Sequence, residues 1–144
     1  MKKKTLIASL LALIITVSVF ANPISNAQTN FNKQFKQATN VTWSKVGERE
    51  KVCFTFEGRA VCAYYNADGK LFSITRSLLS TELPLVLSTE LKQSYKDYWI
   101  TNVSEVANDE GTTYYATLEN ADHEIILKST NISEWAVFQK FKKD

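Results

Sequence analysis

The sequence is poor in the residues that most catalytic and metal-binding motifs require. Its 144 residues include four glycines, two prolines, two cysteines and one histidine. Neither a phosphate-binding glycine loop nor a Gly-x-Ser-x-Gly nucleophile elbow is present. Two cysteines without a Cys-x-x-Cys spacing or a nearby histidine make a poor redox or metal site. We therefore expect no catalytic residue, no metal, no cofactor and no enzyme activity.

A large excess of charge of one sign is also missing. The chain carries 17 Lys and Arg against 15 Asp and Glu, a net charge of +2. Lys2, Lys3 and Lys4 supply three of the 17, so the remaining 14 nearly balance the acidic residues. A near-neutral chain has no electrostatic footprint for nucleic acid or anionic lipid. We expect neither as a partner once the N-terminal segment is removed.

The N-terminal segment has the pattern of an export signal. Three lysines precede an apolar run of sixteen residues, Thr5 to Phe20, which is shorter than the roughly twenty that span a membrane. Small residues offer two cleavage sites, after Ala27 and after Ala21. We favour Ala27, because a proline ends the apolar run upstream and a polar stretch follows. Residues 1–27 are then the signal peptide and residues 28–144 a periplasmic or secreted domain; an uncleaved anchor is the alternative.

Both cysteines fall in a predicted β-hairpin. Residues 51–65 alternate like two strands around a turn at Glu57 and Gly58. A two-residue turn places Cys53 opposite Cys62 at a non-hydrogen-bonded pair, where Cα atoms approach to about 4.5 Å. A three-residue loop with a glycine bulge would shift the register and separate them. Because export permits disulfides, we favour a structural Cys53–Cys62 disulfide over a redox or metal site.

Hydrophobic periodicity predicts two helices, at residues 30–38 and 84–96. After each helix come a tryptophan and short alternating runs that are typical of strands. The predicted strands are residues 41–46, 51–56, 59–65, 70–77, 99–107, 112–119, 124–129 and 134–141.

The two halves match each other in sequence. Phe35-Lys36-Gln37 corresponds to Leu91-Lys92-Gln93 and Trp43 to Trp99, all 56 positions apart. We predict an α+β fold, a tandem repeat of a helix followed by an antiparallel β-meander of about four strands. Repeat one spans about residues 30–80 and repeat two about 81–144. Both helices should pack on one face of the sheet, and the repeats should share one core.

The order of the motifs resembles a known family. They are Phe-x-x-x-Phe-x-x-Ala-x-x-Val-x-Trp at 31–43, Ala-Tyr-Tyr-Asn-x-Asp-Gly at 63–69, Leu-Pro at 83–84, Tyr-Lys-Asp-Tyr-Trp-Ile at 95–100 and Tyr-Tyr at 114–115. After a leader, this order is similar to the β-lactamase-inhibitor-like, PepSY-like secreted proteins of Bacteroidetes. The resemblance covers residues 30–142. It implies a tandem helix-plus-sheet fold, a periplasmic or surface location, no enzyme activity, and binding or inhibition by analogy.

Aromatic residues are plentiful, with sixteen Phe, Trp and Tyr among the 117 residues after Ala27. Strand alternation assigns Tyr64 and Leu71 to the face opposite the helices, and the repeat adds Tyr115 and Trp135. An antiparallel sheet can leave one face in water. Aromatic side chains among small polar ones are typical of a protein-binding surface. These four residues are the candidate binding face; the alternative is that the rings only stabilise neighbouring strands.

The sequence therefore favours a non-enzymatic binding module. It would engage another envelope or secreted protein, as an inhibitor or otherwise, through the exposed sheet face or the hairpin tips. One alternative is a small hydrolase or metal-dependent activity around His123, which lies between Glu119 and Glu124. A lone histidine without a second positioned ligand rarely suffices, so a hairpin turn is the favoured interpretation there. A structural envelope protein without a dedicated ligand is the third possibility.

Overall fold

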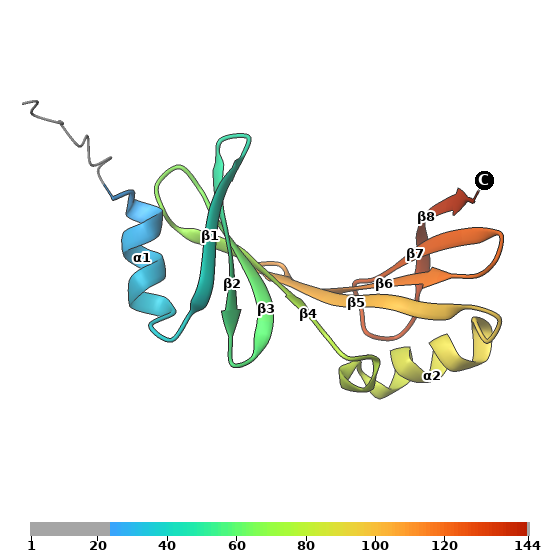
Figure 1. The fold of residues 1–144 in the computed structure, drawn as a ribbon. Coiled ribbons are helices and arrows are strands. Elements are labelled where there is room, and N and C mark those ends of the chain that lie inside the picture. Colours follow the sequence, from blue (N-terminus) through green and yellow to red (C-terminus); the bar gives the residue numbers. More distant parts are fainter. Residues whose placement is uncertain (1–23, 144) are drawn as a thin grey trace, which may run out of the picture.

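A computed structural model describes residues 24–143 of the chain (Figure 1). The predicted export segment before residue 24, with the cleavage site after Ala21, lies outside the described residues. The helices are α1 (Asn26–Gln34), the short 3-10 helix η1 (Ser80–Glu82) and α2 (Leu85–Ser94). The strands are β1 (Thr39–Val46), β2 (Arg49–Phe56), β3 (Arg59–Tyr65), β4 (Leu71–Ser77), β5 (Trp99–Asn108), β6 (Gly111–Glu119), β7 (His123–Ser129) and β8 (Ala136–Lys142). Each predicted strand is present, with ends that differ by at most two residues.

The strands form one eight-stranded antiparallel sheet in which each strand pairs with the next along the chain. The predicted α+β tandem repeat of two helix-plus-meander units is therefore wrong. β4 pairs directly with β5, from Ser73 opposite Asn108 to Ser77 opposite Ser104. More than half of the described residues lie in strands, and the two α-helices have only nine and ten residues. The two halves form one sheet because the chain returns beside β4 after η1 and α2. The edge of β4 that does not pair with β3 is then free to form hydrogen bonds with β5.

Helix α1 begins four residues earlier than predicted. The Ser25 hydroxyl accepts a hydrogen bond from the Gln28 backbone N–H at 3.2 Å, and the Gln28 side chain accepts one from the Ser25 N–H at 3.3 Å. This reciprocal capping box satisfies two N–H groups at the helix start. Ala27 is fully buried. The favoured cleavage site after Ala27 therefore lies inside this helix.

Polar contacts attach α1 to the sheet. The Ser25 hydroxyl donates to a Glu50 carboxylate oxygen at 3.0 Å, and the Asn30 amide donates to the Gly69 carbonyl at 2.7 Å. The Tyr65 hydroxyl donates to Gln34 at 3.0 Å. Burial raises the pKa of Tyr65 to about 12. The helix is thus held at its beginning, middle and end.

Helix α2 agrees more closely with the prediction for residues 84–96. Pro84 stands at the cap position, where its lack of an N–H costs nothing. Leu87 and Leu91, four residues apart, are buried on one side of the helix. The helix ends at Tyr95, whose N–H donates to the Leu91 carbonyl. Apolar spacing located this helix because its buried residues lie centrally within it.

The buried side chains form two separate cores, one beneath each α-helix. The α1 core contains Ala27, Phe31, Val52, Phe54, Val61, Ala63 and Tyr65. The α2 core contains Leu83, Leu87, Leu91, Val103, Ala116, Leu118, Ile125, Leu127 and Trp135. The expectation that both halves share one core is wrong.

Two ion pairs lie between the α1 core and the α2 core, on the face of the sheet that packs against the helices. On β3 and β4, Arg59 pairs with Glu82, and Arg76 donates to Glu105 at 2.5 Å. Arg76 lies opposite Val61 on one side and Glu105 on the other, so its strand position belongs to the helix-facing side. Charged groups at these positions keep the face hydrated, which separates the apolar clusters.

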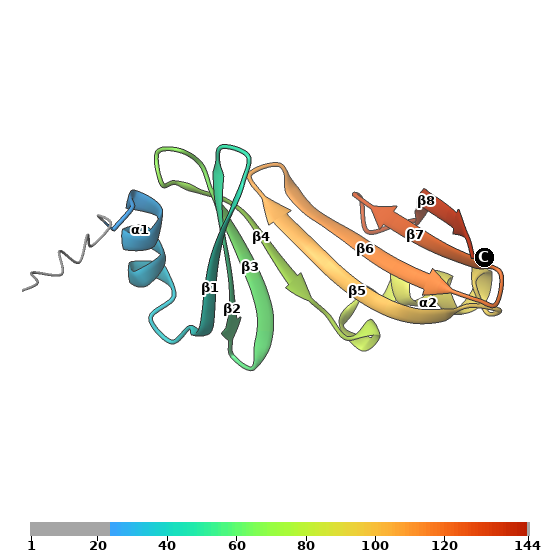
Figure 2. The same ribbon diagram turned by 45° about the horizontal axis from the view of Figure 1, so that its top comes forward.

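Both helices lie against the same face of the twisted sheet. Paired residues Ala63, Ile74 and Ala107 continue this face from the α1 core to β5, and alternation along β5 carries it to Val103 in the α2 core. Helix α1 flanks one end of the sheet and α2 lies beneath the other (Figure 1). Turning the molecule forward places α2 behind β5 and β6 (Figure 2). The face opposite α1 and α2 therefore lies on the inner side of the bend between the two ends of the sheet (Figure 1).

The capping box gives a prediction about the N-terminus. A protein that begins at Gln28 should be less stable than one that begins at Asn22 by about 1 kcal/mol or more, because it lacks the Ser25 cap and the buried Ala27 side chain. Urea denaturation measures the difference, and Ser25→Ala in the longer protein isolates the contribution of the cap. We accordingly expect export to cleave after Ala21, so that mass spectrometry finds Asn22 at the mature N-terminus. Equal stability of the two proteins would contradict this explanation.

The ion pairs give a prediction about pH. Hydrogen bonds from Arg59, and then from the Leu79 N–H, lower the pKa of Glu82 to about 2. A carboxylate with a lowered pKa stabilises the fold above its ordinary pKa, and this stabilisation is lost as the pH falls toward 2. Glu82→Gln should therefore lose less stability than wild type between pH 6 and pH 2. Parallel pH profiles in urea denaturation would contradict the prediction.

Candidate protein-binding face

The face opposite the helices is called the open face, and strand register defines its members. They alternate with the core residues along each strand. They are Thr39, Thr42, Ser44 and Val46 of β1; Arg49, Lys51, Cys53 and Thr55 of β2; Ala60, Cys62 and Tyr64 of β3; Phe72, Ser73, Thr75 and Ser77 of β4; Trp99, Asn102, Ser104, Val106 and Asn108 of β5; Thr113, Tyr115, Thr117 and Glu119 of β6; Glu124, Ile126 and Lys128 of β7; and Ala136, Phe138, Gln139 and Phe141 of β8.

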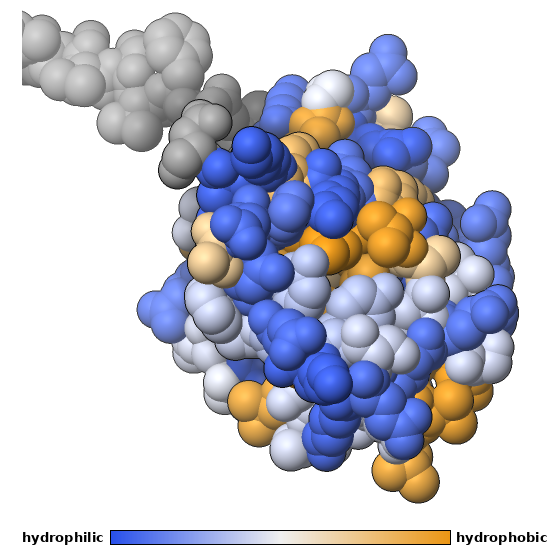
Figure 3. Space-filling view, turned by 90° about the vertical axis from the view of Figure 1, so that its right-hand side faces the viewer, coloured by the Kyte–Doolittle hydropathy of each residue, from blue (hydrophilic) through white to orange (hydrophobic). Residues whose placement is uncertain are grey.

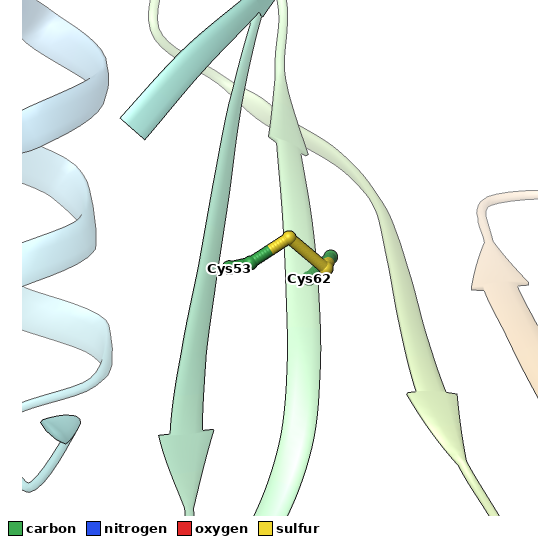
Figure 4. Close-up of a disulfide and its surroundings, with 2 residues drawn as sticks. All are labelled: Cys53 and Cys62. Carbon is green, nitrogen blue, oxygen red and sulfur yellow. A yellow bond between two sulfur atoms is a disulfide. The ribbon is translucent and has the colours of Figure 1, made fainter. Parts of the chain in front are cut away.

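A disulfide fastens β2 to β3 on the open face. Cys53 and Cys62 are bonded across the two strands, with their Cα atoms 4.1 Å apart (Figure 4). The turn contains two residues, Glu57 and Gly58, whose φ angles of 50° and 77° fit the tight hairpin type that matches strand twist. Phe56 therefore lies opposite Arg59, and the predicted register is confirmed.

One aromatic cluster lies beside the disulfide. The Tyr64 and Phe72 rings meet edge to face, with centroids 6.2 Å apart. The Lys51 Nζ lies 5.7 Å from the Tyr64 centroid, and the Arg49 guanidinium carbon lies 4.4 Å from the Phe72 centroid. Each cation is within the range of attraction to a ring face. We call this the first cluster.

A second cluster of the same composition lies on β6, β7 and β8. Tyr115 and Phe138 meet edge to face with centroids 5.8 Å apart, and the Lys128 Nζ lies 5.7 Å from the Phe138 centroid. Lysine lies directly opposite tyrosine in both clusters, Lys51 across from Tyr64 and Lys128 across from Tyr115. The same combination of lysine, tyrosine and phenylalanine thus occurs once in each half of the open face.

β-Bulges place the phenylalanines. Tyr64 lies opposite Ser73 whereas Tyr65 lies opposite Leu71, which leaves Phe72 as the extra residue of a bulge in β4. In β8, Gln139 lies opposite Ile126 and Val137 lies opposite Leu127, so a second bulge leaves Phe138 as the extra residue. A bulge changes the direction in which the local side chains point. Sequence reasoning missed Phe72 and Phe138, because strict alternation cannot locate a bulge.

Two of the four predicted face residues are placed differently. Tyr64 and Tyr115 lie on the open face, but the placement of Leu71 and Trp135 there is wrong. Leu71 packs against the α1 core because of the bulge in β4. Trp135 precedes β8 and is only 7% exposed beneath α2. Its indole N–H donates to the Leu87 carbonyl at 2.9 Å, and its backbone N–H donates to a Glu90 carboxylate oxygen at 3.1 Å. These two hydrogen bonds hold Trp135 against α2.

His123 lies at the beginning of β7, beside the turn between β6 and β7. Its backbone N–H donates to the Asn120 side-chain oxygen at 2.8 Å, and its carbonyl accepts from the Asn120 N–H at 2.9 Å. These bonds close a turn of the kind that asparagine favours. Over residues 24–143, no group of three or more His, Cys, Asp or Glu side chains could hold a metal ion. Within the same range, no helix is long and apolar enough to cross a membrane.

Exposed apolar side chains also occur at the end of the molecule that carries α2 and the last strands. Separate orange groups stand among hydrophilic side chains there (Figure 3). Large apolar residues of these elements are highly exposed, namely Leu85 and Val86 on α2 and Val137, Phe138 and Phe141 on β8. Phe138 and Phe141 belong to the open face, so its apolar character continues to the edge of the sheet.

The architecture is that of a twisted antiparallel sheet with two short helices on one face, and solved structures share it. A candidate periplasmic protein of Bacteroides eggerthii superimposes with a TM-score of 0.72 at 15% identity, over 81% of this chain and 86% of that one. A BLIP-like protein of Bacteroides fragilis gives 0.66 at 17% identity, over 81% and 84%. A DUF2874 family protein of Bacteroides ovatus gives 0.69 at 17%, over 81% and 85%.

The resemblance inferred from the order of the motifs is confirmed at the level of the fold, since these neighbours are BLIP-like and DUF2874 proteins of Bacteroides. No protein-family model matches the chain, and no curated protein matches it.

The disulfide gives a prediction about stability. Changing Cys53→Ser together with Cys62→Ser should lower the free energy of unfolding by about 2–3 kcal/mol, because the bond closes a loop of about ten residues in the unfolded chain. Urea denaturation of both proteins measures this. A reductant should lower the stability of wild type to that of the variant and leave the variant unchanged. A variant as stable as the oxidised wild type would contradict the structural role.

Proposed function

We propose that the protein is a periplasmic, non-enzymatic binding module whose open face engages another envelope or secreted protein. The observation that carries the proposal is the pair of matching clusters, Lys51–Tyr64–Phe72 and Tyr115–Lys128–Phe138, on the face opposite α1 and α2. The leader-like N-terminal sequence and the structural neighbours, one of them a candidate periplasmic protein, support the location.

The clusters have the properties of binding hot spots. Tyrosine contributes a large contact area at a low cost in conformational entropy, because only two side-chain torsions are fixed on binding, and it is enriched among hot spots. Here each ring is already restrained by a neighbouring ring, and Tyr64 also lies beside the disulfide. Side chains that are ordered before binding lose less entropy on binding. The open face is therefore preorganised for a rigid protein partner.

Inhibition is the finer form of this proposal. It rests on the likeness of fold to a protein described as BLIP-like. An inhibitor acts by occupying a surface that its target needs, and a face on the inner side of a bend suits a projecting part of a target. An envelope enzyme with such a projection is the class of target to examine first.

The proposal is tested by site-specific crosslinking. A photoreactive benzoylphenylalanine at Tyr64 or at Tyr115 should crosslink the same envelope protein, because both positions lie on the open face. The same probe at Val86 on α2 should not, since α2 covers the opposite face. A partner captured only from Val86, or different proteins captured from Tyr64 and Tyr115, would contradict the proposal.

Replacing the two tyrosines measures how much the open face contributes to the affinity for this partner. Tyr64→Ser with Tyr115→Ser should weaken binding of the crosslinked partner by about 100-fold or more, since truncating one hot-spot aromatic typically costs about 2 kcal/mol. The matched control, Leu85→Ser with Val86→Ser, removes two exposed apolar side chains from α2 and should leave binding unchanged. Calorimetric titration measures both. Equal losses in the two variants would contradict a binding role for the open face.

A further inference from the structure

The charges of the open face are distributed unevenly. Arg49 and Lys51 are the charged residues that register places on it in β1 to β5, and both are positive. Lys128 adds a positive charge in the second cluster. The acidic residues of the open face, Glu119 and Glu124, lie together at one end beside the turn between β6 and β7, and Glu119 is paired with Lys143 at 2.6 Å. Both aromatic clusters are thus cationic.

These cations differ from the arginines of the helix-facing side. Arg59 and Arg76 each form a salt bridge, with Glu82 and Glu105. No salt bridge in residues 24–143 involves Arg49, Lys51 or Lys128. A ring face attracts a cation but leaves its charge uncompensated. Three positive charges are therefore held in defined places without a carboxylate partner.

We propose that the partner of the open face is a protein with a convex acidic surface, whose carboxylates pair with Lys51 and Lys128. This inference rests on the proposed function and names the chemistry of the partner. Lys51 on β2 and Lys128 on β7 are five strand spacings apart, about 24 Å across the strands, and the register also offsets them by four residues, about 14 Å, along the strands. That separation is larger than the Debye length of about 8 Å at physiological salt. Each lysine therefore selects its own carboxylate, and the pair specifies two acidic sites at a fixed distance.

A membrane or a nucleic acid fits the face less well. Both clusters belong to the open face, and the ribbon places this face on the inner side of the bend of the sheet (Figures 1 and 2), so a flat bilayer cannot contact both clusters. Acidic residues also occupy hairpin tips around the face, with Glu48 and Glu57 at two turns of the first half and Asp109 and Glu110 at the turn between β5 and β6. Repulsion from these rim charges disfavours a rigid polyanion such as duplex DNA, which must cross the rim to reach both clusters, more than a short flexible acidic chain that enters the middle of the face. A protein that presents carboxylates only at its centre avoids this repulsion.

Charge reversal tests the inference with a defined probe. The probe is a random copolymer of glutamate and tyrosine, which offers carboxylates and rings but no fold; a lysine–tyrosine copolymer is its counterpart. Wild type should bind the acidic copolymer, and Lys51→Glu with Lys128→Glu should weaken that binding at least about tenfold. Lys36→Glu with Lys92→Glu changes the net charge equally on exposed helix-side positions and should leave binding unchanged. Lys51→Gln with Lys128→Gln, which removes charge without reversing it, should give an intermediate loss.

Several outcomes would overturn the inference. They are no binding of the acidic copolymer by wild type, equal weakening in the open-face and helix-side variants, or tighter binding to phosphatidylglycerol vesicles or duplex DNA than to the copolymer. Circular dichroism of each variant confirms that the fold is retained, and the glutamine variant decides the matter if the glutamate variant does not fold.

The crosslinked partner separates this inference from the proposed function. If Tyr64→Ser with Tyr115→Ser abolishes partner binding while Lys51→Glu with Lys128→Glu leaves it unchanged, the binding face stands and the acidic partner is overturned. If both pairs weaken binding, and added salt reduces the affinity of wild type more than that of the lysine variants, both are supported. If no partner crosslinks from either tyrosine, the proposed function itself fails.

Discussion

The hydrogen-bonded pairing of β4 with β5 is the interaction on which the rest of the structure depends. Each helix covers only its own strands, and the ion pairs between the α1 core and the α2 core prevent the apolar side chains from merging. Backbone hydrogen bonds across this one strand pair therefore make a single body from two small hydrophobic clusters. Neither cluster is large enough for a secure domain by itself. The twist of the continuous sheet then fixes the angle between them, and so sets the curvature of the open face.

The open face obtains its character from side chains that the cores do not need. Alternation assigns every second strand residue to it, and most of these are small and polar. The aromatic residues of the two clusters appear where a bulge adds one residue, at Phe72 and Phe138, and opposite a lysine on the neighbouring strand, at Tyr64 and Tyr115. Such bulges commonly redirect a side chain at functional sites. Two local irregularities in β4 and β8 thus account for the resemblance of the two clusters.

Much of the local structure could be predicted from sequence, because local patterns decide it. Alternation located all eight strands, and the two-residue turn at Glu57 and Gly58 gave the register that joins Cys53 to Cys62. Features decided by tertiary contacts could not be found this way. Leu71 and Trp135 were misplaced because a bulge and hydrogen bonds to α2 determine their positions. The pairing of β4 with β5 joins residues about thirty positions apart, and the residue pattern of neither strand indicates which strand it pairs with. The start of α1 at Asn26 did have a local signal, the Ser25–Gln28 capping box, which apolar spacing alone overlooks.

The position of the disulfide makes the two ends of the molecule chemically unequal. Cys53 and Cys62 link β2 to β3, and the strands and helix of the α2 core contain no covalent cross-link. Oxidation therefore acts on one half only: it restrains the strands that carry Lys51 and Tyr64, while the Tyr115 cluster relies on packing alone. In a reducing compartment the first cluster would lose this restraint and the second would be unaffected. The open face thus combines one half whose rigidity depends on its redox surroundings with another whose rigidity does not.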